Sequence, residues 1–246
     1  MILSIKDLHA TIENKAVLNG VNLEVGTQET HVLMGPNGAG KTSLAMSLMG
    51  HPNFQITKGT VQFTGKDLLL LKPHQRAQAG LFLSFQQPCE IEGVCLADLL
   101  RQAYNSIYNN TEKQLKLSEF RQFLDKICTK LKLLTSFVER DVNFGFSGGE
   151  KKRAEMLQLM VLQPKLAILD EIDSGLDVDA LTTVCKAINE LRNSPSKTSF
   201  LIITHYKHLL DRIAPDAVHV MKNGKVVESG KSKLAHRIVS EGFNQK

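Results

Sequence analysis

The stretch from Thr30 to Met49 reads THVLMGPNGAGKTSLAMSLM, and it decides the fold. Its first five residues form a mostly apolar run that predicts a buried strand, and Ser43–Met49 form a helical run. Between them, Gly35-Pro36-Asn37-Gly38-Ala39-Gly40-Lys41-Thr42 matches the pattern G-x-x-x-x-G-K-[ST]. A strand, a glycine-rich loop and a helix in this order predict an α/β fold that binds phosphate where the strand ends.

Each residue type in this loop has a chemical use. Glycines permit a turn in which successive backbone N–H groups converge on phosphate oxygens, and the following helix directs its positive end toward the same anion. Lys41 supplies a mobile charge for the terminal phosphates, and Thr42 supplies a hydroxyl ligand for Mg²⁺. Ser43 completes the predicted nucleotide-binding set. The alternative is a glycine-rich loop that matches by chance, which the flanking strand and helix disfavour.

Short apolar runs alternate with helical patterns along the chain, which predicts a largely parallel sheet covered on both faces. Further strands of this sheet are predicted at 81–85, 166–169 and 200–204. A second group, in a region with few helix signals, predicts an antiparallel sheet with strands at 2–12, 17–25 and 61–63. Two hairpins are expected, one punctuated by Gly59 and Gly65 and the other turning at Asn223-Gly224.

The middle of the chain predicts a helical subdomain at 87–165, inserted into the α/β core. Apolar residues at helical spacing occupy positions 96, 99, 100, 103, 104, 107 and 108, and then 120, 123, 124, 127, 131 and 134. We interpret both stripes as the core-facing surfaces of helices. The chain is therefore predicted to be one domain, 1–246, with a catalytic core and antiparallel β subdomain formed by 1–86 and 166–246.

Composition excludes several classes of protein. Of the 246 residues, 42% are hydrophobic and 22% are charged, as in an ordinary globular protein. The net charge of +5 is too diffuse to indicate nucleic-acid binding, although it suits an anionic ligand. No apolar run approaches the roughly 18–20 residues of a membrane span, and Lys6 and Asp7 come too early for a signal peptide. The four cysteines lack a CxxC pair, so we expect reduced thiols in the cytoplasm; a metal or cluster at Cys89 and Cys95 is the less favoured alternative.

Two further motifs lie far from the glycine-rich loop. The strand at 166–169 ends in Asp170-Glu171, where Asp170 can hold Mg²⁺ through a water and Glu171 can polarise a water for attack on a terminal phosphate. A solvated turn is the alternative. Ser147-Gly148-Gly149-Glu150 has the pattern of a helix capping box, and its bare glycines also let a phosphate approach closely. Basic residues follow at 151–153, which indicates a nearby anion or acidic partner.

With these motifs together, the sequence resembles the ATP-binding cassette (ABC) family along essentially its whole length. The signature loop of that family is usually LSGGQ, whereas this chain has FSGGE at 146–150. The family order is reproduced by the phosphate-binding loop, Gln86, the signature Ser147–Glu150, Asp170-Glu171, and two later elements. Those later elements are Ser174-Gly175-Leu176-Asp177, which resembles the D-loop, and His205.

The resemblance implies an ATPase with ATP and Mg²⁺ as cofactors. Gln86 would sense the Mg²⁺ and the attacking water, and His205 would contact the γ-phosphate; a histidine that caps the next helix is the alternative for His205. The family also implies a head-to-tail dimer, in which Ser147 and Gly149 of one subunit face the γ-phosphate held by the other. An isolated subunit is then expected to be a weak ATPase that dimerises transiently with ATP.

One departure concerns the base of the nucleotide. The family usually has an aromatic residue that stacks on adenine about 23 residues before the phosphate-binding loop. The matching positions here are Thr11 and Ile12. Ile12 offers apolar contact without stacking, so the resemblance predicts looser base selectivity, with GTP competing measurably with ATP.

The particular residues within and beside these motifs resemble those of the SufC branch of the family, which serves the Suf iron–sulfur cluster assembly machinery. The residues that carry this resemblance are 145–153, 169–177, 87–94 and 203–206. This resemblance implies soluble SufB and SufD scaffold partners, which we expect to contact residues 86–94 and the start of the helical insertion. It also implies a cytoplasmic or plastid-stroma location and no membrane insertion. The alternatives are the ATPase subunit of a membrane transporter, and a non-transport cassette that acts on nucleic acid or ribosomes or is a mainly structural nucleotide clamp. Proteins of the last kind commonly have two cassettes in one chain, and this chain has one such loop.

Overall fold

Strand β3 (Thr30–Met34) lies inside the six-stranded sheet on which the molecule is built. The computed structural model describes residues 1–86, 88–109, 111–204 and 207–243. In these residues the strand order is β12-β11-β3-β10-β9-β6. The other strands are β6 (Leu81–Ser84), β9 (Leu166–Asp170), β10 (Ser199–Ile203), β11 (Ala217–Lys222) and β12 (Lys225–Gly230). All pairs are parallel except β11 with β12, which confirms the predicted parallel sheet and the hairpin at Asn223-Gly224.

A second sheet is antiparallel, as expected, and has the order β2-β1-β4-β5. Its strands are β1 (Leu3–Ile12), β2 (Lys15–Val25), β4 (Gln55–Phe63) and β5 (Lys66–Asp67). The prediction that Gly59 punctuates a hairpin was wrong, because Gly59 lies inside β4 and the turn lies at Gly65. A Cβ at residue 59 would come within 2.4 Å of the Asp7 carbonyl oxygen, so the close approach of β1 requires glycine there.

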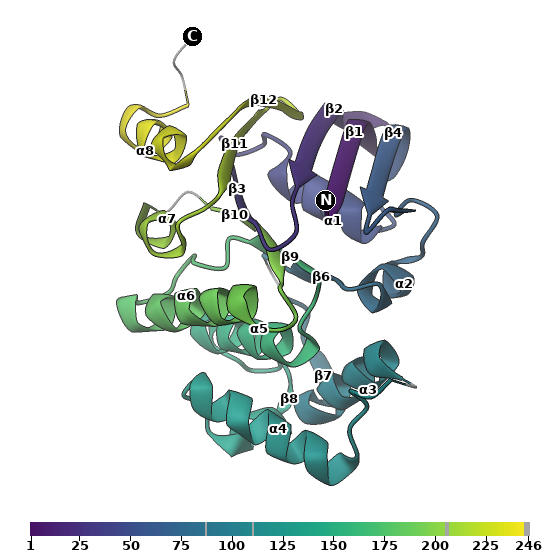
Figure 1. The fold of residues 1–246 in the computed structure, drawn as a ribbon, viewed down its shortest axis with the longest axis vertical. Coiled ribbons are helices and arrows are strands. Elements are labelled where there is room, and N and C mark those ends of the chain that lie inside the picture. Colours follow the sequence, from purple (N-terminus) through teal and green to yellow (C-terminus); the bar gives the residue numbers. More distant parts are fainter. Residues whose placement is uncertain (87, 110, 205–206, 244–246) are drawn as a thin grey trace.

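The middle of the chain forms most of the helical layer at the bottom of Figure 1. Its helices are α3 (Leu96–Tyr108), α4 (Leu117–Lys130), η1 (Thr135–Glu139) and α5 (Gly148–Leu162), followed by α6 (Val178–Asn193). Two expectations need correction. Leu134 does not continue the apolar face of α4, because it lies beyond the helix end and is 78% exposed. The region is also not purely helical, because β7 (Ile91–Cys95) pairs with β8 (Asp141–Val142).

Helix α1 (Lys41–Met49) lies between the two sheets, and this places the glycine-rich loop at the edge of a buried layer. Alternate residues of a strand point to opposite faces, and β3 therefore contributes to two cores. Leu33 packs with α1 and the antiparallel sheet, whereas Val32 and Met34 pack with the helical layer. The remaining helices are α2 (Pro73–Gln78), α7 (Lys207–Ile213) and α8 (Ser232–Glu241).

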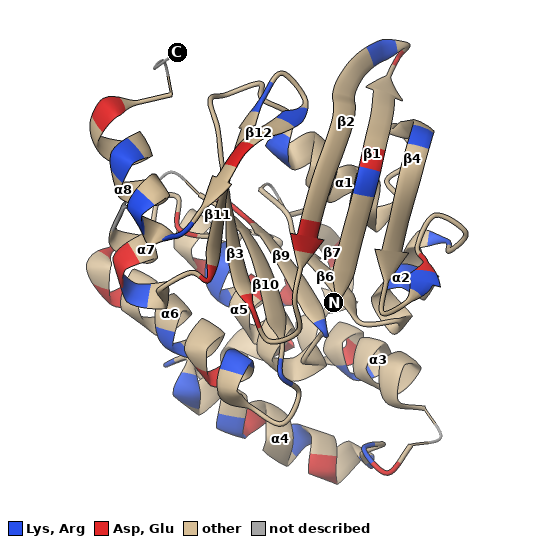
Figure 2. Ribbon diagram, turned by 45° about the horizontal axis from the view of Figure 1, so that its top comes forward, with Lys and Arg blue, Asp and Glu red and all other residues tan. Residues whose placement is uncertain are grey.

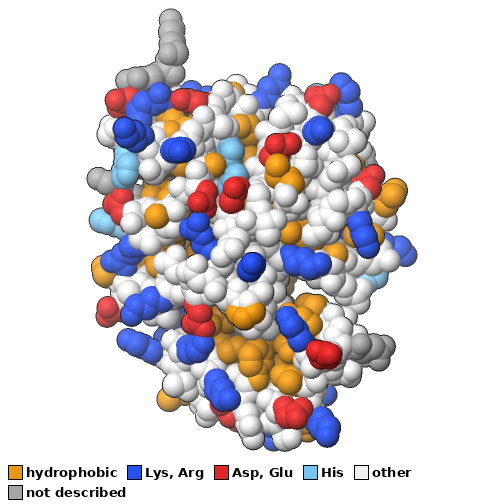
Figure 3. Space-filling model, viewed as in Figure 1, with side chains coloured by type: hydrophobic (Ala, Val, Ile, Leu, Met, Phe, Trp, Pro, Cys, Tyr) orange, Lys and Arg blue, Asp and Glu red, His pale blue; other side chains and the backbone are white. Residues whose placement is uncertain are grey.

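The surface shows how charge and apolar area are distributed. Basic and acidic residues both occur along α4 and α8 (Figure 2), so neither helix presents charge of a single sign. Hydrophobic side chains gather in the hollow between α2 and the lower helical layer (Figure 3). Within the described parts of the chain, each helix is too short or too polar to span a lipid bilayer.

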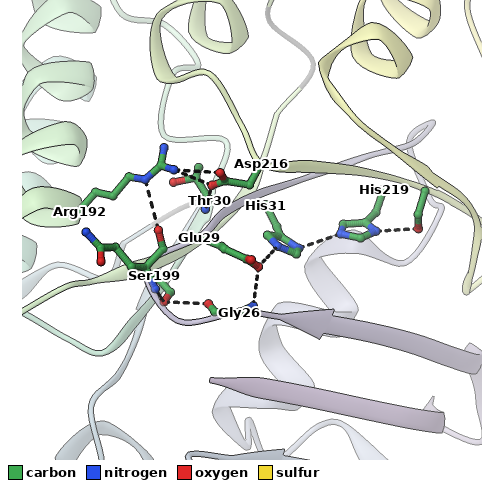
Figure 4. A network of polar contacts seen from close by, with 10 residues as sticks. Gly26, Glu29, Thr30, His31, Arg192, Ser199, Asp216 and His219 are labelled. Atoms are coloured by element: carbon green, nitrogen blue, oxygen red, sulfur yellow. Dashed lines mark hydrogen bonds and ion pairs between the residues drawn. The ribbon is translucent and has the colours of Figure 1, made fainter. Parts of the chain in front are cut away.

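A chain of polar contacts ties β3 to its neighbour β11 at their buried interface (Figure 4). His31 Nε2 lies 2.8 Å from Glu29 Oε2, His31 Nδ1 lies 2.9 Å from His219 Nε2, and His219 Nδ1 lies 2.8 Å from Ser229 Oγ. The Glu29 carboxylate accepts from His31, and every ring nitrogen of the two histidines has a hydrogen-bond partner. Burial, together with His31, lowers the pKa of His219 to about 4.

Candidate nucleotide-binding site

The glycine-rich loop opens onto a cavity of about 720 Å³. Half of its lining residues come from the loop and the first residues of α1, Asn37–Ser43. Gln86 and Glu171 line it on one side. Ala16, Val17, Asn19, Asn223 and Gly224 complete it. The structure thus brings Gln86 and Glu171 to the loop, as the sequence predicts, although both lie far from it in the chain.

The loop backbone and α1 form an anion-binding arrangement. Gly38 and Gly40 have φ values of 77° and 102°, which glycine adopts without the strain that a side chain would impose. Helix α1 begins at Lys41, so its free N–H groups and positive dipole end lie at the cavity. The opposite end of α1 is held by Arg76, a buried side chain that donates to the Ser47 and Leu48 carbonyls at 2.9 and 2.7 Å.

Lys41 is folded back onto the loop. Its Nζ donates to the carbonyl oxygens of Gly35 at 2.7 Å and Pro36 at 3.0 Å. Burial lowers the pKa of Lys41, and the nearby carboxylates of Glu171 and Asp170 oppose that shift. The ammonium is therefore held beside the cavity by two neutral acceptors, from which an anionic phosphate can draw it.

Asp170 ends β9 inside the protein, where it is 1% exposed. Neither of its carboxylate oxygens accepts a hydrogen bond of ordinary geometry from the residues that the structure describes. Burial raises the pKa of Asp170, and the neighbouring Thr42 hydroxyl opposes the rise. An unpartnered buried carboxylate beside a hydroxyl is an oxygen donor set that suits Mg²⁺.

Glu171 follows Asp170 in a left-handed conformation, with a φ of 51°. Its backbone N–H donates to the Ile203 carbonyl at 3.0 Å, which fixes this conformation. The Gln86 amide donates from Nε2 to Glu171 Oε2 at 2.8 Å, so the two residues form a pair at the mouth of the cavity. A carboxylate that is held by an amide and left exposed on its other side can orient a water.

The signature residues lie elsewhere. Ser147 caps α5 by accepting from the Glu150 N–H at 3.3 Å, and Glu150 accepts from the Ser147 N–H at 2.8 Å, which confirms the predicted capping box. These bonds and Arg140, which donates to Glu150 at 2.6 Å, lower the pKa of Glu150 to about 2. No signature residue is among the described residues that line the loop cavity. Gly148 instead lines a neighbouring cavity of about 560 Å³ with Glu171.

The basic residues after the signature find acidic partners inside the chain. Lys151 Nζ lies 2.6 Å from Glu90 Oε1, and Lys152 Nζ lies 3.6 Å from Glu155 Oε2. Lys152 and Glu155 are both buried on α5. Burial raises the pKa of Glu155, and Lys152 opposes the rise. The acidic partner expected from the sequence is thus found within this chain for Lys151 and Lys152.

The remaining predicted residues are placed as follows. Gly175 lines the cavity that contains Gly148, and Asp177 begins α6 by accepting from the Ala180 N–H at 2.7 Å. His205 lies outside the described residues. All four cysteines are free thiols, and the described part of the chain has no group of three or more His, Cys, Asp or Glu side chains arranged to hold a metal ion.

Sequence reasoning missed one wall of the cavity. The positions expected to contact the base, Thr11 and Ile12, are not among the described lining residues, whereas Ala16 and Val17 are. No described residue of the lining is aromatic. Asn19 and the Asn223-Gly224 turn also line the cavity. The Asn-Gly pair predicts a turn, but no local signal shows that this turn meets the glycine-rich loop.

Comparisons with known proteins agree on one family. A family model described as "ABC transporter" matches residues 18–174. "Vegetative protein 296" of Bacillus subtilis is 50% identical over 242 residues, which cover 98% of this chain and 92% of that protein. "Probable ATP-dependent transporter SufC" of Escherichia coli is 46% identical and covers 98% of this chain and 97% of its own length.

The fold agrees as well. A solved structure described as the ATP-binding subunit of an ABC transporter covers 99% of this chain and 95% of its own. It superposes with a TM-score of 0.80 at 23% sequence identity. The arrangement of a parallel sheet, an antiparallel sheet and a helical layer is therefore that of an ATP-binding cassette.

Proposed function

Because this chain belongs to the ABC family and is an ATPase of that family, we propose that it drives conformational change in a soluble iron–sulfur cluster assembly scaffold. The observation that carries the enzymatic part is the meeting of Lys41, Glu171 and Gln86 around one cavity, with the buried carboxylate of Asp170 beside Thr42. Similarity to a protein named SufC, at 46% identity over nearly the full length, supports the cellular part.

We assign the chemistry to these residues as follows. The loop amides and Lys41 would hold the phosphates, and Thr42 and Asp170 would hold Mg²⁺, with Asp170 acting through a water. Bound Mg²⁺ would neutralise charge on the terminal phosphates. Glu171 polarises the attacking water, and Gln86 holds its carboxylate in place at 2.8 Å. Gln86 would also be a ligand of bound Mg²⁺, and the family resemblance implies that His205 would contact the γ-phosphate.

The site is proposed to become complete only in a dimer. The signature residues Ser147–Glu150 do not line the loop cavity of their own chain. A second subunit, packed head-to-tail, would bring its Ser147 and Gly149 to the γ-phosphate, together with its D-loop at Ser174–Asp177. A subunit that stays single is then expected to bind ATP and to hydrolyse it slowly.

The partner-facing surface is proposed to include residues 86–94 and the start of α3. Two large apolar side chains are exposed here: Phe85, directly before this stretch, is 39% exposed, and Ile91 within it is 41% exposed. Pro88 and Cys89 line a cavity of about 160 Å³ beside them. Because Gln86 joins this surface to Glu171, a scaffold that docks here would contact the catalytic pair directly.

The test is recovery of native complexes. The tagged chain should co-purify with SufB- and SufD-like scaffold proteins, as identified by mass spectrometry. Ile91→Asp should lose these partners, while the exposed control Leu134→Asp, far along the chain beyond α4, should retain them. Recovery of multi-span membrane subunits in place of the scaffold would establish the alternative, the ATPase subunit of a membrane transporter. The word "transporter" in the name of the Escherichia coli relative keeps that alternative in view.

A further inference from the structure

We propose that the Asn223-Gly224 turn, locked by Asn19, is a positioning element that fixes the orientation of the glycine-rich loop and thereby sets its affinity for nucleotide. This inference rests on the proposed nucleotide site and is independent of the partner. It begins from three segments that meet at one wall of the cavity: β2, the loop before α1, and the β11–β12 hairpin.

Three hydrogen bonds lock these segments together. Asn19 donates from its backbone N–H to the Gly224 carbonyl, and from Nδ2 to the Asn223 carbonyl, both at 2.9 Å. Gly224 in turn donates its N–H to the Ala39 carbonyl at 2.9 Å. The turn is thus fixed on one side by β2 and holds the loop on the other.

The bond to Ala39 controls where a loop amide points. A trans peptide is planar, and its C=O and N–H point in opposite directions. Because the Ala39 carbonyl is held toward Gly224, the N–H of Gly40, which belongs to the same peptide unit, is directed away from the turn. This is one of the loop N–H groups available to a phosphate, so the turn acts on phosphate binding without touching the phosphate.

Close packing leaves the turn little freedom. A Cβ at Gly224 would come within 2.7 Å of the Val17 carbonyl oxygen and 2.8 Å of Asn19 Nδ2. A Cβ at Gly40 would come within 2.9 Å of the same Val17 oxygen. Asn223 and Gly224 have φ values of 48° and 74°, the two positive values that a tight Asn-Gly hairpin turn requires. Any added atom must therefore displace the turn from β2, from the loop, or from both.

The turn has no catalytic group, so its effect should fall on binding. An amide that contacts phosphate before and during reaction contributes equally to both states, and its loss raises KM without lowering kcat. Gly224→Ala should weaken Mg–ADP binding and raise the KM for ATP about tenfold, as expected for one misdirected hydrogen bond. The kcat should stay within about twofold of the parent value.

The structure offers a matched control. Gly65 also lies in a hairpin turn with a φ of 78°, and a Cβ there would meet nothing within 4 Å. Gly65→Ala therefore has the same backbone strain without the clash. Asn19→Ala and Asn22→Ala form a second pair on β2, because Asn22 also makes two hydrogen bonds but at a distance from the loop. This pair decides the question if Gly224→Ala does not fold.

Mg–ADP titration by calorimetry, with steady-state kinetics and melting temperatures, provides the measurements. We expect Gly224→Ala to bind Mg–ADP more weakly than Gly65→Ala does. We likewise expect Asn19→Ala to bind Mg–ADP more weakly than Asn22→Ala does. The kcat for ATP hydrolysis should be unchanged in all four variants. Equal binding within both pairs would overturn the positioning role, and so would a loss confined to kcat. Failure of the parent protein itself to bind Mg–ADP would count against the nucleotide site rather than against the turn.

Discussion

Lowering the pH is expected to destabilise the protein through His219, the buried ring between His31 and Ser229. The folded state holds this ring neutral until about pH 4, whereas an unfolded chain protonates it near its ordinary value of 6.5. Between these values the unfolded state binds more protons, so stability falls as the pH falls. At about 1.4 kcal/mol per pKa unit, the loss is about 2 kcal/mol at pH 5 and about 3 kcal/mol below pH 4.

Urea denaturation at about pH 8 and about pH 5 measures this loss, and His219→Gln separates it from the loss due to other groups. Glutamine can still contact His31 and Ser229 but does not titrate. The variant should be less stable than the parent at pH 8, and its stability should fall less between the two pH values. Groups outside this chain of contacts, such as Glu90 with the pKa that Lys151 lowers, respond to acid in both proteins alike. Equal falls in the two proteins would refute the reasoning.

Other expectations concern the site itself. Glu171→Gln should keep ATP binding but lose at least about a hundredfold in turnover, because the amide cannot polarise water. Gel filtration with ATP should then show a trapped dimer. Turnover like that of the parent would refute the assignment of Glu171 as the residue that polarises water. Arg76→Met should lower the free energy of unfolding by about 3 kcal/mol, since the carbonyls of Ser47 and Leu48 lose a buried charged donor; a loss below about 1 kcal/mol in urea would contradict this. GTP should compete measurably with ATP, because no aromatic residue is found among the described residues lining the cavity. A large preference for ATP in a competition assay would contradict this expectation and would show that the base is selected without aromatic stacking.

The parts of the fold that local patterns determine could be predicted. The strand, loop and helix around Lys41 follow from residues next to one another in the chain, and the capping box at Ser147 follows from a four-residue pattern. The continuously apolar run that ends in Asp170 indicates both its burial and its position at the end of a strand. These elements are the ones that the structure confirms.

The parts that depend on which strands become neighbours could not be predicted. His31 and His219 are 188 positions apart, and they meet because β11 lies beside β3. Asn19 and Asn223 are 204 positions apart, and their contact has no signal in either segment. Which residues of the β1–β2 hairpin line the cavity has the same cause: Ala16 and Val17 line it and Ile12 is not among the described lining residues, because the bend of the hairpin relative to the cavity is set by tertiary packing. Leu134 fits a helical period but lies past the last turn, where periodicity has no structural meaning.

The cavity wall formed by β2, the glycine-rich loop and the β11–β12 hairpin has a consequence for biosynthesis. A ribosome makes Asn19 and Lys41 long before Gly224. The nascent protein therefore lacks this wall of the nucleotide pocket until the β11–β12 hairpin has been made. If the hairpin orients the loop as proposed, a fragment that ends before it would retain the glycine-rich motif without its support, and the motif alone would be a poor guide to activity.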